Sequence, residues 1–154
     1  MTIPLEIIDL SKTYDSKEAV RNISFKVNEN EIIGILGPNG CGKTTTIGMI
    51  LGLLKPTKGK VLINGIEIEK QRVELLNELN FISPYIELPK KLTVKQNLEV
   101  YGRLYDVKKL GIKIDYLCEK LRLNEFINKI TGELSSGQKN RVSLAKSIIN
   151  DPSV

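Results

Sequence analysis

The sequence predicts an α/β fold with three parts in chain order: a β-rich start, one α/β unit and a mostly helical remainder. Three observations carry this prediction. Apolar residues alternate with polar ones near the N-terminus, a continuous apolar run precedes a glycine-rich turn, and apolar residues recur at helical spacing from Thr93 onward. The length of 154 residues allows one domain at most.

The β-rich start consists of short alternating segments. Leu5–Ile7 and Ile23–Val27 place apolar residues at every second position, which is typical of half-buried antiparallel strands. Tyr14–Glu18 between them is expected to form a turn or loop. Later in the chain, Asn64-Gly65 separates two β-favouring runs and predicts a hairpin with a type I′ turn.

The α/β unit begins with Ile32–Leu36, a β-favouring run without polar alternation. Such a run is typical of a strand that is covered on both faces in a parallel sheet. The helical spacing of Ile47, Ile50, Leu51 and Leu54 after the glycine-rich turn predicts a helix. A further strand is expected near Phe81-Ile82.

The remainder is predicted to be helical. Thr93 and Gln96 form the pattern of a capping box, which predicts a helix from Thr93 to Tyr105. Further helices are expected at about Ile114–Leu121, briefly around Phe126-Ile127, and from about Ser136 to Ile149.

Composition excludes several function classes. The net charge of +5 comes from lysines spread along the chain, without the basic run or aromatic-interleaved stripe of a nucleic-acid binder, so no nucleic acid is expected. No window is apolar enough to span a membrane, and the N-terminus lacks the pattern of a signal peptide, so we expect a cytoplasmic chain. Without histidine or a paired cysteine motif, zinc ligation is not expected, and Cys118 is expected to be a core thiol.

The glycine-rich turn, Gly37–Thr44, fits the pattern G-x-x-x-x-G-K-[ST] without deviation. Glycines let successive backbone N–H groups converge on an anion, and a helix that begins near Gly42 adds its positive dipole end. Lys43 is expected to reach the β- and γ-phosphates of a nucleotide, and the Thr44 hydroxyl to coordinate Mg²⁺. The predicted cofactor-binding residues of this segment are Gly37, Pro38, Asn39, Gly40, Cys41, Gly42, Lys43, Thr44 and Thr45.

A second motif, Leu134–Gln138, precedes the last predicted helix. By itself, Ser-Ser-Gly at this place is most simply a helix N-cap. Together with the phosphate-binding loop, however, the motif resembles the ATP-binding-cassette (ABC) family, whose signature is usually Leu-Ser-Gly-Gly-Gln. Ser136 stands where that signature has a glycine.

The resemblance implies a P-loop ATPase fold with an antiparallel β subdomain (1–30 and 58–69), a P-loop core (31–57 and 70–84) and a helical subdomain with the signature helix (92–149). It implies that Tyr14 stacks on adenine. Because two such domains pair head to tail in the family, it also implies that Ser135, Gly137 and Gln138 contact the ATP held by a partner's loop.

Two departures from the family pattern bear on catalysis. Pro84 stands where the family usually has a glutamine that ligates Mg²⁺, so either Ser83 substitutes or this ligand is missing. The chain also ends at Val154, where the Walker B strand of the family would start, so the Walker B aspartate, the catalytic glutamate and the switch histidine are absent. We therefore expect no catalytic residue in these 154 residues, negligible hydrolysis by them alone, and an unpaired apolar edge beside Ile32–Leu36.

The function that these features favour is the ATP-binding subunit of an ABC transporter. It would bind MgATP, pair with a second ABC domain, and act at the inner face of the membrane through separate permease subunits. Tyr85–Lys91 and the helix that starts at Thr93 are expected to meet the permease, although a solvated loop and an ordinary core helix explain them nearly as well. The alternatives are a soluble ABC ATPase of translation or DNA repair, and a non-hydrolysing nucleotide binder.

Overall fold

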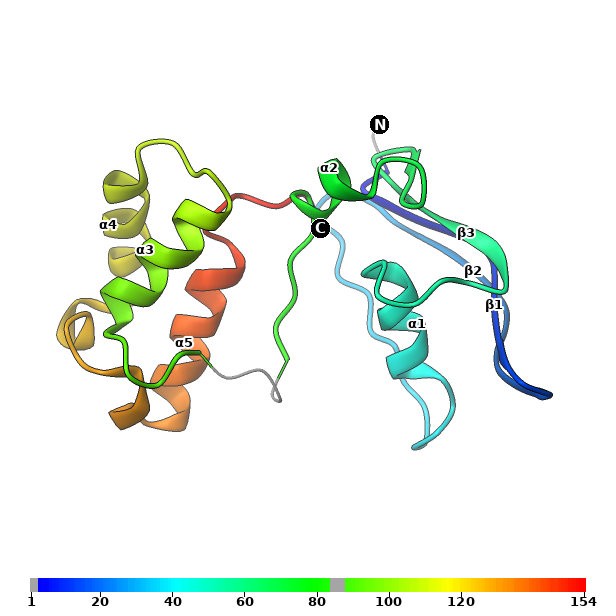
Figure 1. Cartoon of the computed structure of the whole chain (residues 1–154), viewed down its shortest axis with the longest axis horizontal. Helices are drawn as coiled ribbons and strands as arrows, with labels where there is room; N and C mark the ends of the chain where they lie inside the picture. The colour runs from blue at the N-terminus through cyan, green and yellow to red at the C-terminus, as the bar shows by residue number, and fades with distance from the viewer. Residues whose placement is uncertain (1–2, 84–87) are drawn as a thin grey trace. The chain divides into compact units, whose positions relative to one another are not determined.

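The computed structural model describes residues 3–83 and 88–154 (Figure 1). The chain divides into two compact units, Met1–Leu79 with Ser153–Val154, and Asn80–Pro152. Each unit has a separate cluster of buried apolar residues.

The first unit contains a four-stranded antiparallel sheet. Its strands are β1 (Leu5–Tyr14), β2 (Lys17–Val27), β3 (Lys58–Ile63) and β4 (Ile66–Glu67), in the order β2-β1-β3-β4. β1 is one of the two inner strands, and its Leu5 is paired with Val27 on one side and Ile63 on the other. Leu5 and Ile7 of β1 and Val61 and Ile63 of β3 are buried at every second position, as the period of two requires.

The predicted hairpin between β3 and β4 is confirmed. Asn64 has φ 49° and Gly65 has φ 79°, and positive φ at both central residues defines the type I′ turn. The turn expected within Tyr14–Glu18 is also present, as a tight connection at Asp15-Ser16 between β1 and β2.

Two helices complete the first unit, α1 (Lys43–Ile50) and the short α2 (Arg72–Leu76). Met49 and Ile50 of α1 join the apolar core of the sheet, together with Leu75 of α2. The predicted helix after the glycine-rich turn is therefore confirmed, and one side of it is anchored on the sheet.

The prediction of strands at Ile32–Leu36 and at Phe81-Ile82 is wrong. Both runs are extended but belong to no sheet, and Ile32 and Leu36 are 97% and 93% exposed. A parallel strand needs neighbouring strands to accept and donate its backbone hydrogen bonds. Within residues 3–83 and 88–154, all strands belong to the four-stranded sheet, so the two runs lack such neighbours.

The second unit is helical. It contains α3 (Val94–Leu104), α4 (Leu110–Lys120), the 3₁₀ turns η1 (Asn124–Phe126) and η2 (Thr131–Glu133), and α5 (Ser136–Ser147). α4 begins four residues before the expected start. The apolar core of the second unit includes Leu98, Leu117, Phe126, Val142 and Ile149, and Cys118 is buried among them, as predicted. No helix within the described part of the chain is both long and apolar enough to cross a bilayer.

The capping box predicted at Thr93 is present. The Gln96 amide donates to Thr93 Oγ1 at 3.1 Å, and the Thr93 amide donates to Gln96 Oε1 at 2.9 Å. Two otherwise unbonded donors at the start of α3 are thus satisfied within one turn.

The chain leaves and re-enters the first unit at adjacent points. The Val154 amide donates to the carbonyl of Glu78 at 3.0 Å, and Asn64 Nδ2 donates to Ser153 Oγ at 3.0 Å. Within the second unit, Asn80 Nδ2 donates to Asn150 Oδ1 at 2.6 Å. The helical unit is therefore inserted between Leu79 and Ser153, and its two ends lie together.

Two glycines of the first unit provide a matched test of the sheet. Gly59 and Gly65 both have φ 79°, but a Cβ on Gly59 would lie 2.3 Å from the Asp9 carbonyl oxygen, whereas a Cβ on Gly65 would meet open space. We predict that Gly65→Ala lowers the free energy of unfolding by about 1–2 kcal/mol through backbone strain alone. Gly59→Ala is expected to lower it by a further ~1–3 kcal/mol, because β1 must shift. Urea denaturation of both variants measures the difference, and equal losses would contradict the close approach.

Candidate functional site

The phosphate-binding loop is held against β2 by Gly42. Its φ of 93° is in the left-handed region, and a Cβ there would lie 2.4 Å from the Ala19 carbonyl oxygen and 3.0 Å from Val20 Cγ2. Only glycine fits both the backbone conformation and this approach. The second glycine of the motif therefore fixes the start of α1 on the sheet.

The first turn of α1 has backbone donors that are not used within the helix. Its N-cap is Gly42, and no side chain of the described residues caps it. The intrahelical bonds begin with Thr46, whose amide donates to the Gly42 carbonyl at 2.8 Å. The N–H groups of Lys43, Thr44 and Thr45 thus lie at the positive end of the helix dipole without an intrahelical acceptor, and this arrangement suits an anion.

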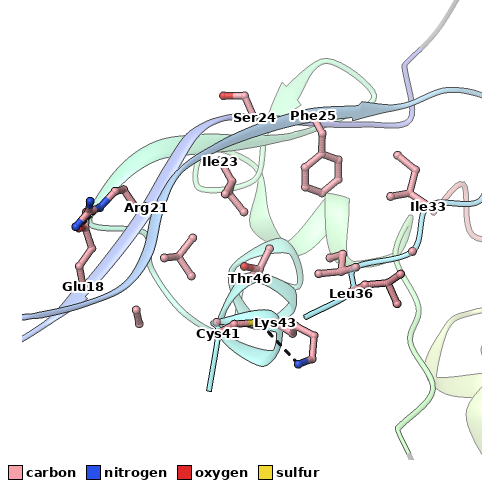
Figure 2. A pocket seen from close by; sticks show the side chains of 15 residues that line it. Glu18, Arg21, Ile23, Ser24, Phe25, Ile33, Leu36, Cys41, Lys43 and Thr46 are labelled. Atoms are coloured by element: carbon pink, nitrogen blue, oxygen red, sulfur yellow. Dashed lines mark hydrogen bonds and ion pairs between the residues drawn. The ribbon is translucent and has the colours of Figure 1, made fainter. Parts of the chain in front are cut away.

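Lys43 extends over the loop. Its Nζ donates to the carbonyl oxygens of Gly37 and Pro38, both at 2.7 Å, and lies 3.8 Å from Cys41 Sγ. Figure 2 shows the contact between Lys43 and Cys41 as a dashed line. The ammonium therefore lies against the backbone of Gly37 and Pro38 and beside the Cys41 thiol.

A hollow of about 810 Å³ lies beside this loop and is lined by residues of β2, of the segment that precedes the loop, and of α1 (Figure 2). One wall is apolar, from Ile23 and Phe25 of β2 and Ile33 and Leu36 of the preceding segment, and the other carries Lys43 and Thr46. Its full lining consists of Glu18, Ala19, Val20, Arg21, Ile23, Ser24, Phe25, Ile33, Gly34, Ile35, Leu36, Cys41, Gly42, Lys43 and Thr46.

The remaining loop residues predicted to bind nucleotide are accessible. Pro38, Asn39, Gly40 and Thr44 are exposed, and Thr45 is half-buried. Tyr14, the predicted adenine-stacking residue, lies at the end of β1, is 45% exposed, and has Lys12 Nζ 5.1 Å from its ring centroid. It does not line the hollow, so the structure does not bring it together with Lys43 around that space.

The signature residues begin α5 and form a second capping box. The Gln138 amide donates to Ser135 Oγ at 3.3 Å, and the Ser135 amide donates to Gln138 Oε1 at 2.9 Å. The N-cap interpretation of this motif is therefore confirmed. Ser135, Ser136 and Gly137 are exposed, and a Cβ on Gly137 would meet no atom within 4 Å. The contact with a partner's nucleotide stays a prediction.

Sequence reasoning missed three polar residues around this motif. The Arg141 guanidinium lies 5.0 Å from the Phe126 ring centroid, and its Nη1 donates to the Arg122 carbonyl at 3.1 Å. Asn97 and Thr131 are 1% and 2% exposed. The sequence signal for Asn97 was a polar residue between Val94 and Leu98, on the apolar face of α3.

Pro84 stands where the ABC family usually has a glutamine that ligates Mg²⁺, and it lies outside the described residues, as does Tyr85.

Comparisons with known proteins show which proteins this chain is similar to. A family model described as ABC transporter matches residues 20–154. The chain is 37% identical over 150 residues to the Nod factor export ATP-binding protein I of Rhizobium etli, covering 96% of this chain and 48% of that protein. It is 32% identical over 157 residues to the ABC transporter ATP-binding protein NatA of Bacillus subtilis, covering 97% of this chain and 64% of that protein.

A solved structure with a similar fold is cbiO1 of Clostridium perfringens, described as part of the ABC transporter complex cbiONQ. The TM-score is 0.86 at 26% identity, over 99% of this chain and 63% of that one. The chain thus spans between about half and two thirds of the length of these relatives. Because the family model matches residues 20–154, which is most of the sequence, this chain belongs to the ABC transporter family.

Proposed function

We propose that this chain supplies the ATP-binding part of an ABC transporter subunit that couples ATP hydrolysis to transport through separate membrane subunits. The observation that carries the proposal is the start of α1, where backbone donors have no cap, together with the Lys43 ammonium, which lies on the Gly37 and Pro38 carbonyls of the same loop. A row of N–H groups and one cation suits a chain of phosphates. Tyr14 at the end of β1 is proposed to stack on the adenine.

Mg²⁺ is proposed to accompany the nucleotide. The described residues contain no group of three or more acidic, cysteine or histidine side chains that could hold a metal ion. Mg²⁺ prefers a few protein oxygens together with water and substrate phosphates, so a dedicated acidic cage is not needed for it to bind here. Thr44 presents an exposed hydroxyl on the second residue of α1 and is the proposed protein ligand.

The signature residues are proposed to act on the ATP of a second ABC domain in a head-to-tail pair. Ser135 and Gly137 are exposed at the N-terminus of the twelve-residue helix α5, where an anion is favoured by the helix dipole. Ser135 Oγ accepts from the Gln138 amide, so its O–H could donate a hydrogen bond to a γ-phosphate oxygen without breaking the cap.

Membrane permease subunits are the proposed partners, which would place the protein at the inner face of the membrane. The names of the relatives refer to export, to a transporter and to a transporter complex, which favours transport over translation or DNA repair. We also propose that the chain divides into three subdomains. These are an antiparallel β subdomain (1–30 with 58–69), a P-loop core (31–57 with 70–84) and a helical subdomain with the signature helix (92–149). Co-sedimentation of the protein with ribosomes rather than membranes would argue against this function.

Lys43→Ala tests the nucleotide site. We predict that ATP affinity falls by about 10–100-fold, because a charge-assisted hydrogen bond to phosphate is lost. Isothermal titration calorimetry measures the ATP affinity of the variant. Lys55→Ala is the control, because Lys55 is an exposed lysine of the same unit and is paired with Glu69. Unchanged affinity in the Lys43 variant would refute the assignment.

The two cysteines test the position of the nucleotide within one molecule. Cys41 is exposed in the loop, whereas Cys118 is buried in the helical unit, where desolvation, with a smaller contribution from Asp115, raises its thiol pKa. We predict that MgATP slows alkylation of Cys41 several-fold and leaves the slower reaction of Cys118 unchanged. Mass spectrometry of peptides after timed iodoacetamide treatment separates the two sites. No protection of Cys41 would mean that the nucleotide lies elsewhere.

A further inference from the structure

Asn97 and Thr131 form a buried polar pair between two segments of the helical unit. They are 1% and 2% exposed, although both are polar. Asn97 Nδ2 lies 3.3 Å from Thr131 Oγ1 and also faces the carbonyl oxygens of Thr93 at 3.0 Å, Pro89 at 3.3 Å and Leu92 at 3.4 Å. One amide therefore contacts the whole turn that leads into α3.

Thr131 completes this arrangement from the other segment. Its Oγ1 lies 2.7 Å from the Pro89 carbonyl oxygen and 3.0 Å from that of Leu92. A hydroxyl has one proton to donate and two lone pairs, so Thr131 can donate to one of these carbonyls while it accepts from Asn97. Asn97 and Thr131 are thus hydrogen-bonded to each other and to the same two carbonyl oxygens, those of Pro89 and Leu92.

The pair lies on a backbone seam between residues 90–95 and 127–132. The seam consists of four hydrogen bonds: Val94 N to Lys129 O at 3.0 Å, Lys95 N to Ile127 O at 2.9 Å, Thr131 N to Leu92 O at 2.9 Å, and Gly132 N to Lys90 O at 3.0 Å. Two of the donors come from the first turn of α3. The seam therefore fixes the start of α3 relative to the segment that follows η1.

The same segment leads directly into the signature. The Leu134 amide donates to the Thr131 carbonyl at 3.4 Å, and the Leu134 side chain is buried. The next residue, Ser135, caps α5. One backbone hydrogen bond and the buried Leu134 side chain thus connect Thr131 with the residue that precedes the N-cap of α5.

The donors of Asn97 account for the choice of asparagine. Asn97 Oδ1 is buried and has no hydrogen-bond partner within the described residues, which destabilises the folded state. An apolar side chain would remove that cost, but it would also leave the carbonyl oxygens of Thr93, Pro89 and Leu92 without the Asn97 amide donor. The amide supplies directed donors, which an apolar side chain lacks.

We propose that Asn97 and Thr131 are positioning residues that hold the signature, Ser135 to Gln138, in place through residues 131–134. The functional part of this inference rests on the proposed action of the signature on a partner's ATP. Thr131→Val tests the pair because it keeps the shape of the side chain and removes the hydroxyl. Thr131→Ser keeps the hydroxyl and serves as the conservative rescue.

The first measurement is amide hydrogen exchange by NMR, which does not depend on nucleotide. In Thr131→Val, we expect the Gln138 amide to exchange about five- to tenfold faster, because its bond to Ser135 Oγ opens more often. Thr131→Ser should keep the wild-type rate, and the Thr46 amide of the first unit should not change. Cys118→Ala, a cavity in the same core, is the control for general destabilisation. If Gln138 changes no more than other α5 amides, or no more than in Cys118→Ala, the positioning role is refuted.

The second measurement is MgATP-dependent pairing of the chain by analytical ultracentrifugation. Thr131→Val is expected to weaken pairing about tenfold while ATP affinity at the loop stays at the wild-type value, and Thr131→Ser is expected to restore pairing. Unchanged pairing in Thr131→Val would overturn the functional part of the inference. Absence of ATP binding to the wild-type chain would instead overturn the proposed function, and the exchange data would still decide the positioning role.

Discussion

Much of this structure depends on how the first backbone N–H groups of its α-helices obtain hydrogen-bond acceptors. Every α-helix begins with N–H groups that have no partner within the helix. At α3 and α5 these groups are satisfied by capping boxes, and at α3 also by carbonyls from residues 127 and 129. At α1 the N-cap is a glycine without a side-chain acceptor. The third residue of α1, Thr45, thus presents a backbone donor that the capping boxes use at the same position of α3 and α5.

The placement of that loop depends on close packing against the sheet. Gly42 approaches β2 so closely that a methyl group would collide with its backbone. α1 is held from its other side by Met49 and Ile50 in the core of the first unit. The N-terminal end of α1 is therefore packed against the antiparallel sheet, whereas the segment that precedes the loop lies outside any sheet.

Local patterns in the sequence predicted the features that local interactions determine. The Asn64-Gly65 turn and the Thr93 capping box each depend on residues within one turn, and both were found where the pattern placed them. The strands at Ile32–Leu36 and Phe81-Ile82 were predicted from composition, but a parallel strand depends on partners elsewhere in the chain, which composition does not reveal. Asn97 and Thr131 escaped prediction for a related reason. Their contact joins residues 34 positions apart, and no periodic pattern marks it.

The adjacent exit and return of the chain at Glu78 and Val154 have an evolutionary consequence. An inserted unit whose two ends lie together can be exchanged, lengthened or lost while the host unit keeps its own contacts. The sheet and phosphate-binding loop could thus diverge at a different rate from the helical insert that carries the signature. Recombination between relatives at these two joints would combine the sheet and its glycine-rich loop with a different helical unit.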